Sequence, residues 1–147
     1  METSTMVDID AAPAVVWGVM TEIERWPEWT QSIARIERLD PGPLRPGSRA
    51  RIKQPGFPPA VWLVTEVDEG RGFTWVARSP GARVTAHHRI APRDGGSRVT
   101  LSLHYAGRLG PLLGRLTRRV TERYLGYEAR GLKGRSEERM RDAAGSA

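Results

Sequence analysis

The sequence of 147 residues contains no cysteine, and its 23 basic residues include only two lysines, Lys53 and Lys133. The absence of cysteine excludes disulfide frameworks, thiolate nucleophiles, iron–sulfur clusters and cysteine-ligated zinc. No apolar run approaches the roughly eighteen residues that a membrane-spanning helix needs. The first ten residues carry acids in place of the basic segment of a signal peptide. We therefore expect a cytoplasmic protein without a transmembrane segment.

The composition is that of an ordinary globular chain, with 39% hydrophobic and 27% charged residues. A chain of this length fits one hydrophobic core. We expect a single domain over residues 1–142. Small polar residues end the chain, which predicts a frayed tail over residues 143–147.

The net charge of +6 is concentrated near the C-terminus. Residues 1–107 hold 13 basic and 12 acidic side chains, whereas residues 108–147 hold 10 and 5. We expect no nucleic-acid partner, because no aromatic interleaving and no recognisable binding module accompany this charge. The basic C-terminal segment favours contact with a protein or an anionic membrane surface instead.

Hydrophobic periodicity predicts a strand, two short helices, six strands and one long helix. Alternation predicts the first strand over residues 6–10, and apolar spacing of three and four predicts a helix from Pro13 to about Glu22. Pro27 favours a second short helix over residues 26–33. Segments between Gly and Pro clusters predict the next strands, over residues 34–39, 48–54, 60–67, 72–77, 83–90 and 98–106.

The last segment returns to a helical period and predicts one helix from about Pro111 to Arg141. Its expected apolar stripe consists of Leu113, Leu116, Val120, Tyr124 and Tyr127. A seven-stranded antiparallel sheet has a buried face too wide for two short helices, so the long helix must cover the rest. The fold class is therefore α+β. A helix laid across a curved sheet leaves a cavity, and mostly apolar cavities bind small molecules.

Several motifs carry a family resemblance that covers nearly the whole chain. They are Val16-Trp17, the stretch from Glu24 to Trp29, Gln54-Pro55-Gly56, and Tyr124-Leu125 through Lys133. In this layout the chain resembles the SRPBCC superfamily, and within it the polyketide cyclase/dehydrase-like group. The resemblance implies the helix-grip fold of START lipid-binding domains and the birch pollen allergen. It also implies a hydrophobic, aromatic, polyketide-like or lipid-like ligand.

On the strands, alternation points several side chains toward the expected cavity. Gln54 and Trp75 are candidate wall residues, and Leu103 and Tyr105 share the inner face of the last strand. For Trp62 the alternation is ambiguous. His88 shares the apolar face of its strand, where an imidazole could orient a ligand or move a proton. The alternative is a histidine satisfied by a neighbouring backbone or hydroxyl group.

On the helices, Trp29 and Ile33 follow the Trp-Pro turn and are candidates for the mouth of the cavity. Val120 and Tyr124 approach from the long helix. Glu128 lies beside the apolar stripe, where a buried carboxyl can become a general acid. The alternatives are core packing for Trp29, Tyr105 and Tyr124, and an ion pair with an arginine for Glu128.

Two functions remain open from the sequence. The first is binding of a hydrophobic or aromatic small molecule, with aldol-type cyclisation or dehydration as the chemistry if the protein is an enzyme. The second is a non-catalytic interaction module that uses the basic helix. Adjacent strand residues point to opposite faces, so His87 and His88 cannot share a metal. We predict no metal site, no cofactor, and a monomer or homodimer.

Overall fold

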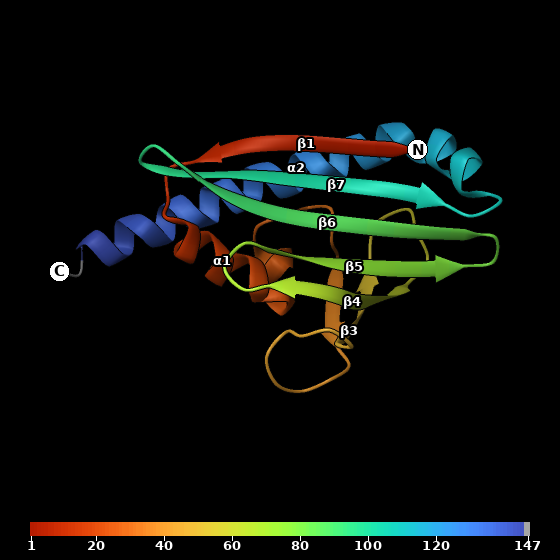
Figure 1. Cartoon of the computed structure of the whole chain (residues 1–147), viewed down its shortest axis with the longest axis horizontal. Helices are drawn as coiled ribbons and strands as arrows, with labels where there is room; N and C mark the ends of the chain where they lie inside the picture. Colours follow the sequence, from red (N-terminus) through yellow and green to blue (C-terminus); the bar gives the residue numbers. More distant parts are fainter. Residues whose placement is uncertain (146–147) are drawn as a thin grey trace.

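The computed structural model of this chain describes residues 1–145, and its strands form one curved antiparallel sheet (Figure 1). The strand order is β1-β7-β6-β5-β4-β3-β2, so the first strand pairs with the last one. The strands are β1 (Glu2–Ile9), β2 (Arg35–Arg38), β3 (Arg49–Lys53), β4 (Ala60–Asp68), β5 (Gly72–Ser79), β6 (Ala82–Arg93) and β7 (Gly96–Ala106). Short Gly-containing turns join β4 through β7, as expected for hairpins between sequence neighbours.

Three helical segments lie against this sheet: α1 (Pro13–Thr21), the 3-10 helix η1 (Ile23–Glu28) and α2 (Gly110–Gly145). The long helix α2 runs the length of the sheet and packs on β1, β7 and α1 (Figure 1). This arrangement confirms the predicted α+β architecture of seven strands, two short helices and a long C-terminal helix. None of the helices within residues 1–145 combines the length and apolar character needed to cross a bilayer.

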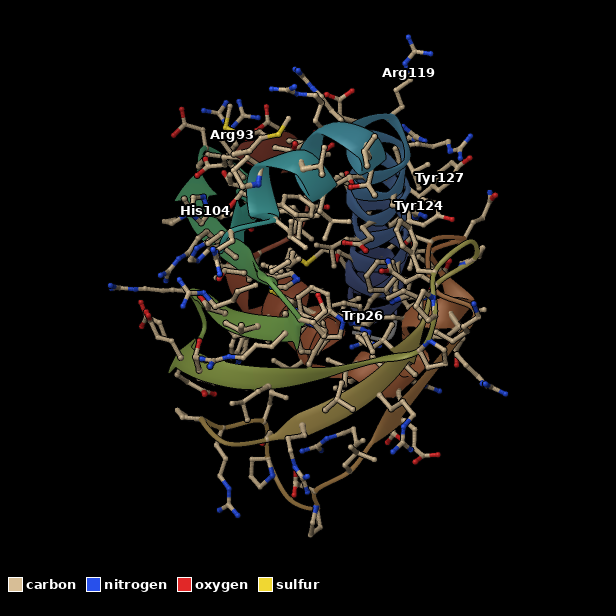
Figure 2. The ribbon with its side chains drawn as sticks, turned by 90° about the vertical axis from the view of Figure 1, so that its right-hand side faces the viewer. Trp26, Arg93, His104, Arg119, Tyr124 and Tyr127 are labelled. Carbon is tan, nitrogen blue, oxygen red and sulfur yellow. The ribbon has the colours of Figure 1, made fainter. Side chains whose placement is uncertain are left out.

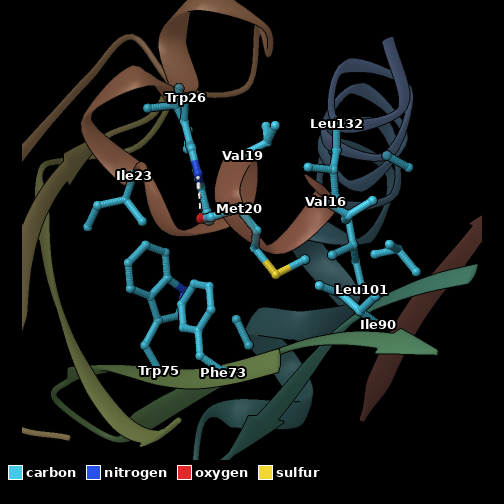
Figure 3. Close-up of a cluster of buried hydrophobic side chains, with 14 of the residues drawn as sticks. Val16, Val19, Met20, Ile23, Trp26, Phe73, Trp75, Ile90, Leu101 and Leu132 are labelled. Atoms are coloured by element: carbon cyan, nitrogen blue, oxygen red, sulfur yellow. Dashed lines mark hydrogen bonds between the residues drawn. The ribbon is translucent and has the colours of Figure 1, made fainter. Parts of the chain in front are cut away.

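The hydrophobic core lies between the short helices and the concave face of the sheet (Figure 3). Trp26 is at its centre, and its indole N–H donates to the carbonyl oxygen of Met20 over 3.0 Å. The Trp26 ring lies 5.4 Å from the ring of Trp75 and 6.3 Å from that of Phe73. These contacts fix η1 between α1 and β5, because a buried indole both fills space and satisfies its donor.

Two sequence predictions about helix boundaries were wrong. The second helix spans Ile23–Glu28 with Pro27 inside it, rather than residues 26–33. The hydrogen bond from the Trp26 indole to the Met20 carbonyl oxygen connects this segment to α1, and the helix therefore begins at Ile23, before the predicted start. The helix α2 continues to Gly145 without a break, so residues 143–145 of the predicted frayed tail are helical, and the last two residues lie outside the described part.

The fourth strand contains a β-bulge that explains why its alternation was ambiguous. The pairing of β4 with β5 shifts between Val64 and Glu66. A bulge adds one residue and reverses which side chains face inward. Before it, Trp62 is half-buried while Val61 and Leu63 are 43% and 38% exposed.

Candidate functional site

The structure contains a cavity of about 320 Å³ between the concave face of the sheet and α2. Its walls come from η1, from β3 through β7, and from one face of α2. Such a volume lies at the lower end of the range for small-molecule sites. It equals the liquid volume of about ten water molecules, which corresponds to a ligand of roughly ten to twenty non-hydrogen atoms. The cavity predicted from the topology is therefore present.

Aromatic rings form much of the wall. Trp26, Trp62 and Trp75 all line the cavity. The ring centroids of Trp62 and Trp75 are 5.7 Å apart, and Trp26 continues this row toward η1. Rings arranged at such distances present flat, polarisable surfaces that suit an aromatic guest. The sequence predicted Trp75 as a wall residue and left Trp62 open, and Trp26 also belongs to the hydrophobic core.

His88 lines the cavity and is only 5% exposed. Its ring stacks on Phe73 at 4.2 Å with an interplanar angle of 10°, and its Nδ1 lies 3.2 Å from the Phe73 carbonyl oxygen. A carbonyl oxygen only accepts, so Nδ1 carries the proton and Nε2 is an acceptor. Burial lowers the pKa of His88 to about 4. The imidazole is therefore neutral near pH 7, and its role in orienting a ligand or moving a proton stays a prediction.

Glu128 brings a carboxyl group to the cavity wall from α2. The hydroxyl of the fully buried Ser32 donates to Glu128 Oε1 over 3.1 Å. Oγ1 of Thr30 lies 2.8 Å from Oγ of Ser32. Burial raises the pKa of Glu128 to about 7. Within residues 1–145 no cation forms an ion pair with this carboxyl, so the predicted pairing with an arginine was wrong. A hydroxyl compensates a buried charge less than a guanidinium does, which leaves the carboxyl partly protonated near neutrality.

The two tyrosines of the predicted site also line the cavity, but both hydroxyls have protein partners. Tyr105 Oη lies 3.0 Å from Thr121 Oγ1, which ties β7 to α2. Tyr124 donates to the carbonyl oxygen of Pro55, and its ring packs edge-on against Phe57 at 6.2 Å. Tyr124 therefore holds the loop between β3 and β4 against α2. These contacts agree with the alternative of structural tyrosines.

The remaining predicted residues separate into two groups. Ile33, Gln54 and Leu103 line the cavity. Trp29 does not; it lines an adjoining space of about 10 Å³, hardly one water molecule, together with His88 and Glu128. The Trp29 carbonyl oxygen also packs against α2 at Gly131, where an added Cβ would lie 1.8 Å away.

Val120 is absent from the wall because α2 presents a different face from the expected one. The helix turns Leu113, Thr117, Thr121 and Leu125 toward the cavity. Leu116, predicted on the same stripe as Val120, is 74% exposed. Small and hydroxylated residues face inward because Tyr105 approaches the helix closely. An added Cβ at Gly114 would lie 3.2 Å from the Tyr105 ring.

Two further residues escaped sequence reasoning: Ser32, which donates to Glu128 on the wall, and Arg78. Ser32 lies in an irregular segment with no periodicity to indicate its direction. Arg78 lines the cavity and is exposed, so it lies at the rim.

Among residues 1–145 no group of three or more His, Asp or Glu side chains is placed to hold a metal ion.

The geometry can be compared with known proteins. A family model described as polyketide cyclase/dehydrase and lipid transport matches residues 1–137. The chain belongs to this family. The match confirms the resemblance to the SRPBCC superfamily inferred from the sequence motifs. No curated protein matches the chain.

Solved structures of the same fold include one whose name gives an activity. The Zhui aromatase/cyclase from Streptomyces sp. R1128 superposes with a TM-score of 0.79 at 16% identity, covering 97% of each chain. Ara h 8.0201 superposes with a TM-score of 0.71 at 15% identity, covering 92% of this chain and 97% of that one. A START superfamily protein from Mycobacterium smegmatis superposes with a TM-score of 0.71 at 18% identity, covering 93% of this chain and 97% of that one. At these identities the likeness establishes the shared helix-grip fold of this family member and its relatives.

Proposed function

We propose that this protein binds a small, flat, hydrophobic molecule in the cavity between the sheet and α2. The observation that carries the proposal is the cavity of about 320 Å³ walled by Trp26, Trp62 and Trp75. Burying an aromatic ligand against these rings gains roughly 25 cal/mol for each Å² of apolar surface removed from water. Membership of a family described by cyclase, dehydrase and lipid-transport functions supports a hydrophobic ligand.

Polar groups on the wall favour a ligand with one or two hydroxyl or carbonyl groups. Nδ1 of His88 is bound to Phe73, which leaves Nε2 as an acceptor for a ligand hydroxyl. The amide of Gln54 also lies on the wall and offers both a donor and an acceptor. A phenol or an aromatic ketone would use both the rings and these polar groups.

A titration with 2-naphthol tests this proposal, because the molecule is neutral, fluorescent and small enough for the cavity. Leu103→Trp replaces the leucine side chain with a larger indole in the cavity, beside Ala86, the residue that pairs with Leu103 on β6. We expect wild type to bind one 2-naphthol molecule and Leu103→Trp to bind it at least about tenfold more weakly. Leu63→Trp, on the exposed side of β4, is the matched control and should bind like wild type. Equal affinity in the two variants would contradict a site in the cavity.

A second candidate function is proton-transfer catalysis at Glu128, in the manner of an aldol cyclisation. Its specific support is a carboxyl on the cavity wall whose pKa of about 7 allows it to exist in both forms near neutrality. The carboxylate takes a proton from the carbon beside one ketone, and that carbon attacks a second ketone in the same molecule. The carboxylic acid then returns the proton to the new alkoxide. Loss of water from the resulting alcohol gives an unsaturated ring.

This chemistry can be tested with an aryl-substituted diketone that has three carbons between its carbonyl groups. We expect wild type to accelerate its conversion to the cyclohexenone, and Glu128→Gln to lose about a hundredfold or more of that rate while still binding 2-naphthol. Glu138→Gln, at an exposed position of the same helix, is the control. Equal rates in wild type and Glu128→Gln would leave the protein a binder alone.

A further inference from the structure

The turn before α2 and the first turns of this helix expose three large apolar side chains to solvent. Leu109, Leu112 and Leu116 are 51%, 52% and 74% exposed. They account for three of the seven large hydrophobic residues exposed among residues 1–145. Single exposed leucines are common, but three within eight residues form a patch that calls for a partner.

These leucines begin a regular stripe that continues along the outer face of α2. We name it the leucine–arginine stripe, and its spacing alternates between three and four residues: Leu109, Leu112, Leu116, Arg119 and Arg123. Residues at this spacing lie above one another on a helix. The stripe lies away from the cavity, since Leu113 and Thr117 are the residues of the same turns that face it.

The charge along this part of α2 is almost entirely positive. Residues 108–123 contain five arginines and one acid, Glu122, which pairs with Arg118 over 2.9 Å. Within the described chain, no carboxylate lies at ion-pair distance from Arg108, Arg115 or Arg119. Figure 2 shows Arg119 extending from the helix into solvent.

In the far half of the same helix, ion pairs hold Lys133, Arg135 and Arg139. Arg135 pairs with Glu28 over 3.0 Å, and Arg139 pairs with Glu22 over 2.7 Å. Both pairs fasten α2 to η1 and α1. The cations that fasten α2 to the other helices therefore lie in its far half, whereas Arg108, Arg115 and Arg119 beside the leucines make no such pairs.

We propose that the leucine–arginine stripe docks the protein on an anionic lipid bilayer. Leucines on one helical stripe can enter the boundary between headgroups and acyl chains, while arginines beside them reach lipid phosphates. Each arginine near a negatively charged leaflet adds attraction that salt weakens. A second copy of this chain is a poorer occupant, because pairing two such stripes would bring their unpaired arginines together. The proposal is independent of the ligand in the cavity, although Leu113 and Thr117 place the docked helix beside it.

Vesicle flotation tests the proposal with the full chain. Vesicles of phosphatidylcholine alone are compared with vesicles that contain about one third phosphatidylserine, in about 0.1 M and about 0.5 M NaCl. We expect wild type to float with the anionic vesicles at the lower salt, and at least about tenfold less protein with neutral vesicles or at the higher salt.

Two stripe variants and two controls locate the surface. Arg119→Gln/Arg123→Gln and Leu112→Gln/Leu116→Gln should each lower binding to anionic vesicles at least about tenfold. Arg35→Gln/Arg71→Gln removes the same charge from exposed positions on other elements, and Val61→Gln/Leu63→Gln removes apolar side chains exposed on β4. Both controls should bind like wild type.

Three results would overturn the proposal. These are failure of wild type to float with anionic vesicles, equal binding to neutral vesicles, or equal losses in stripe and control variants. Light scattering of wild type and Leu112→Gln/Leu116→Gln identifies the competing occupant, since a dimer that the leucine variant dissociates would assign the stripe to a second copy. Binding of 2-naphthol should stay unchanged in every stripe variant, so failure of docking and failure of the cavity site are distinguishable.

Discussion

Replacing Glu128 by glutamine should make the protein more stable at high pH and have little effect at low pH. In the folded chain the pKa of this carboxyl is about 7, against 4.5 for an ordinary glutamate, because burial disfavours its charge more than Ser32 favours it. A folded state that holds its proton more tightly is stabilised below pH 4.5. That stability is lost as the pH rises through 7.

The difference between the two pKa values corresponds to at most about 3 kcal/mol at pH 8. Glutamine keeps the shape and accepts the Ser32 hydroxyl bond with its carbonyl oxygen, but carries no charge to desolvate. The free energy of unfolding of Glu128→Gln minus that of wild type should therefore rise by about 2 to 3 kcal/mol between pH 5 and pH 8.

Urea denaturation at both pH values measures this difference directly. Comparing the two proteins at each pH cancels the other groups that titrate. Glu138→Gln, from an exposed position of α2, should show no such rise. If Glu128→Gln and wild type lose stability in parallel as the pH rises, the carboxyl is not a buried acid and the argument for its chemistry fails.

Other changes test the packing around the site. Gly131→Ala should destabilise the protein by about 1 to 3 kcal/mol, because the new methyl group would lie 1.8 Å from the carbonyl oxygen that follows η1. Gly134→Ala meets nothing within 4 Å and should stabilise the helix by about 1 kcal/mol, and thermal unfolding compares the two. Tyr105→Phe leaves the Thr121 hydroxyl unpaired and should cost about 1 kcal/mol in urea, whereas no loss would show that water replaces the bond. The pKa of His88 falls from 6.5 to about 4 on folding, so wild type should lose at most about 3 kcal/mol as the pH drops through this range, and His88→Asn should lack that loss in the same titration.

The strands and their inward faces could be predicted because alternation is a strong signal where one side of a sheet is buried. Both His88 and Tyr105 were placed on the inner face from this pattern alone, and both line the cavity. Alternation fails to predict the inward side chains where a bulge shifts the register of a strand. The bulge after Val64 on β4 is such a place, and it left the direction of Trp62 undecided.

The face of α2 could not be predicted from hydrophobicity, because this helix buries small and hydroxylated residues and exposes leucines. Thr121 is 5% exposed and Leu116 is 74% exposed, the reverse of the usual order. The close approach of Tyr105 requires small residues on the inner face, and a one-dimensional pattern does not reveal such a partner. The hydroxyl contact of Ser32 with Glu128 joins residues 96 positions apart and was equally invisible.

The cytoplasmic location, the absence of a nucleic-acid partner, and the monomeric or dimeric state stay predictions from the sequence. The oligomeric state follows from the light-scattering measurement described for the leucine–arginine stripe.

Intermolecular nuclear Overhauser effects with 2-naphthol test the central claim most directly, because they report which side chains touch the ligand. Occupation of the cavity predicts contacts from the naphthalene protons to Trp75, Leu101 and Leu103, with Leu103→Trp abolishing them. Contacts confined to Leu112 and Leu116 on the outer face of α2, or none at all, would contradict a ligand site between the sheet and the helix.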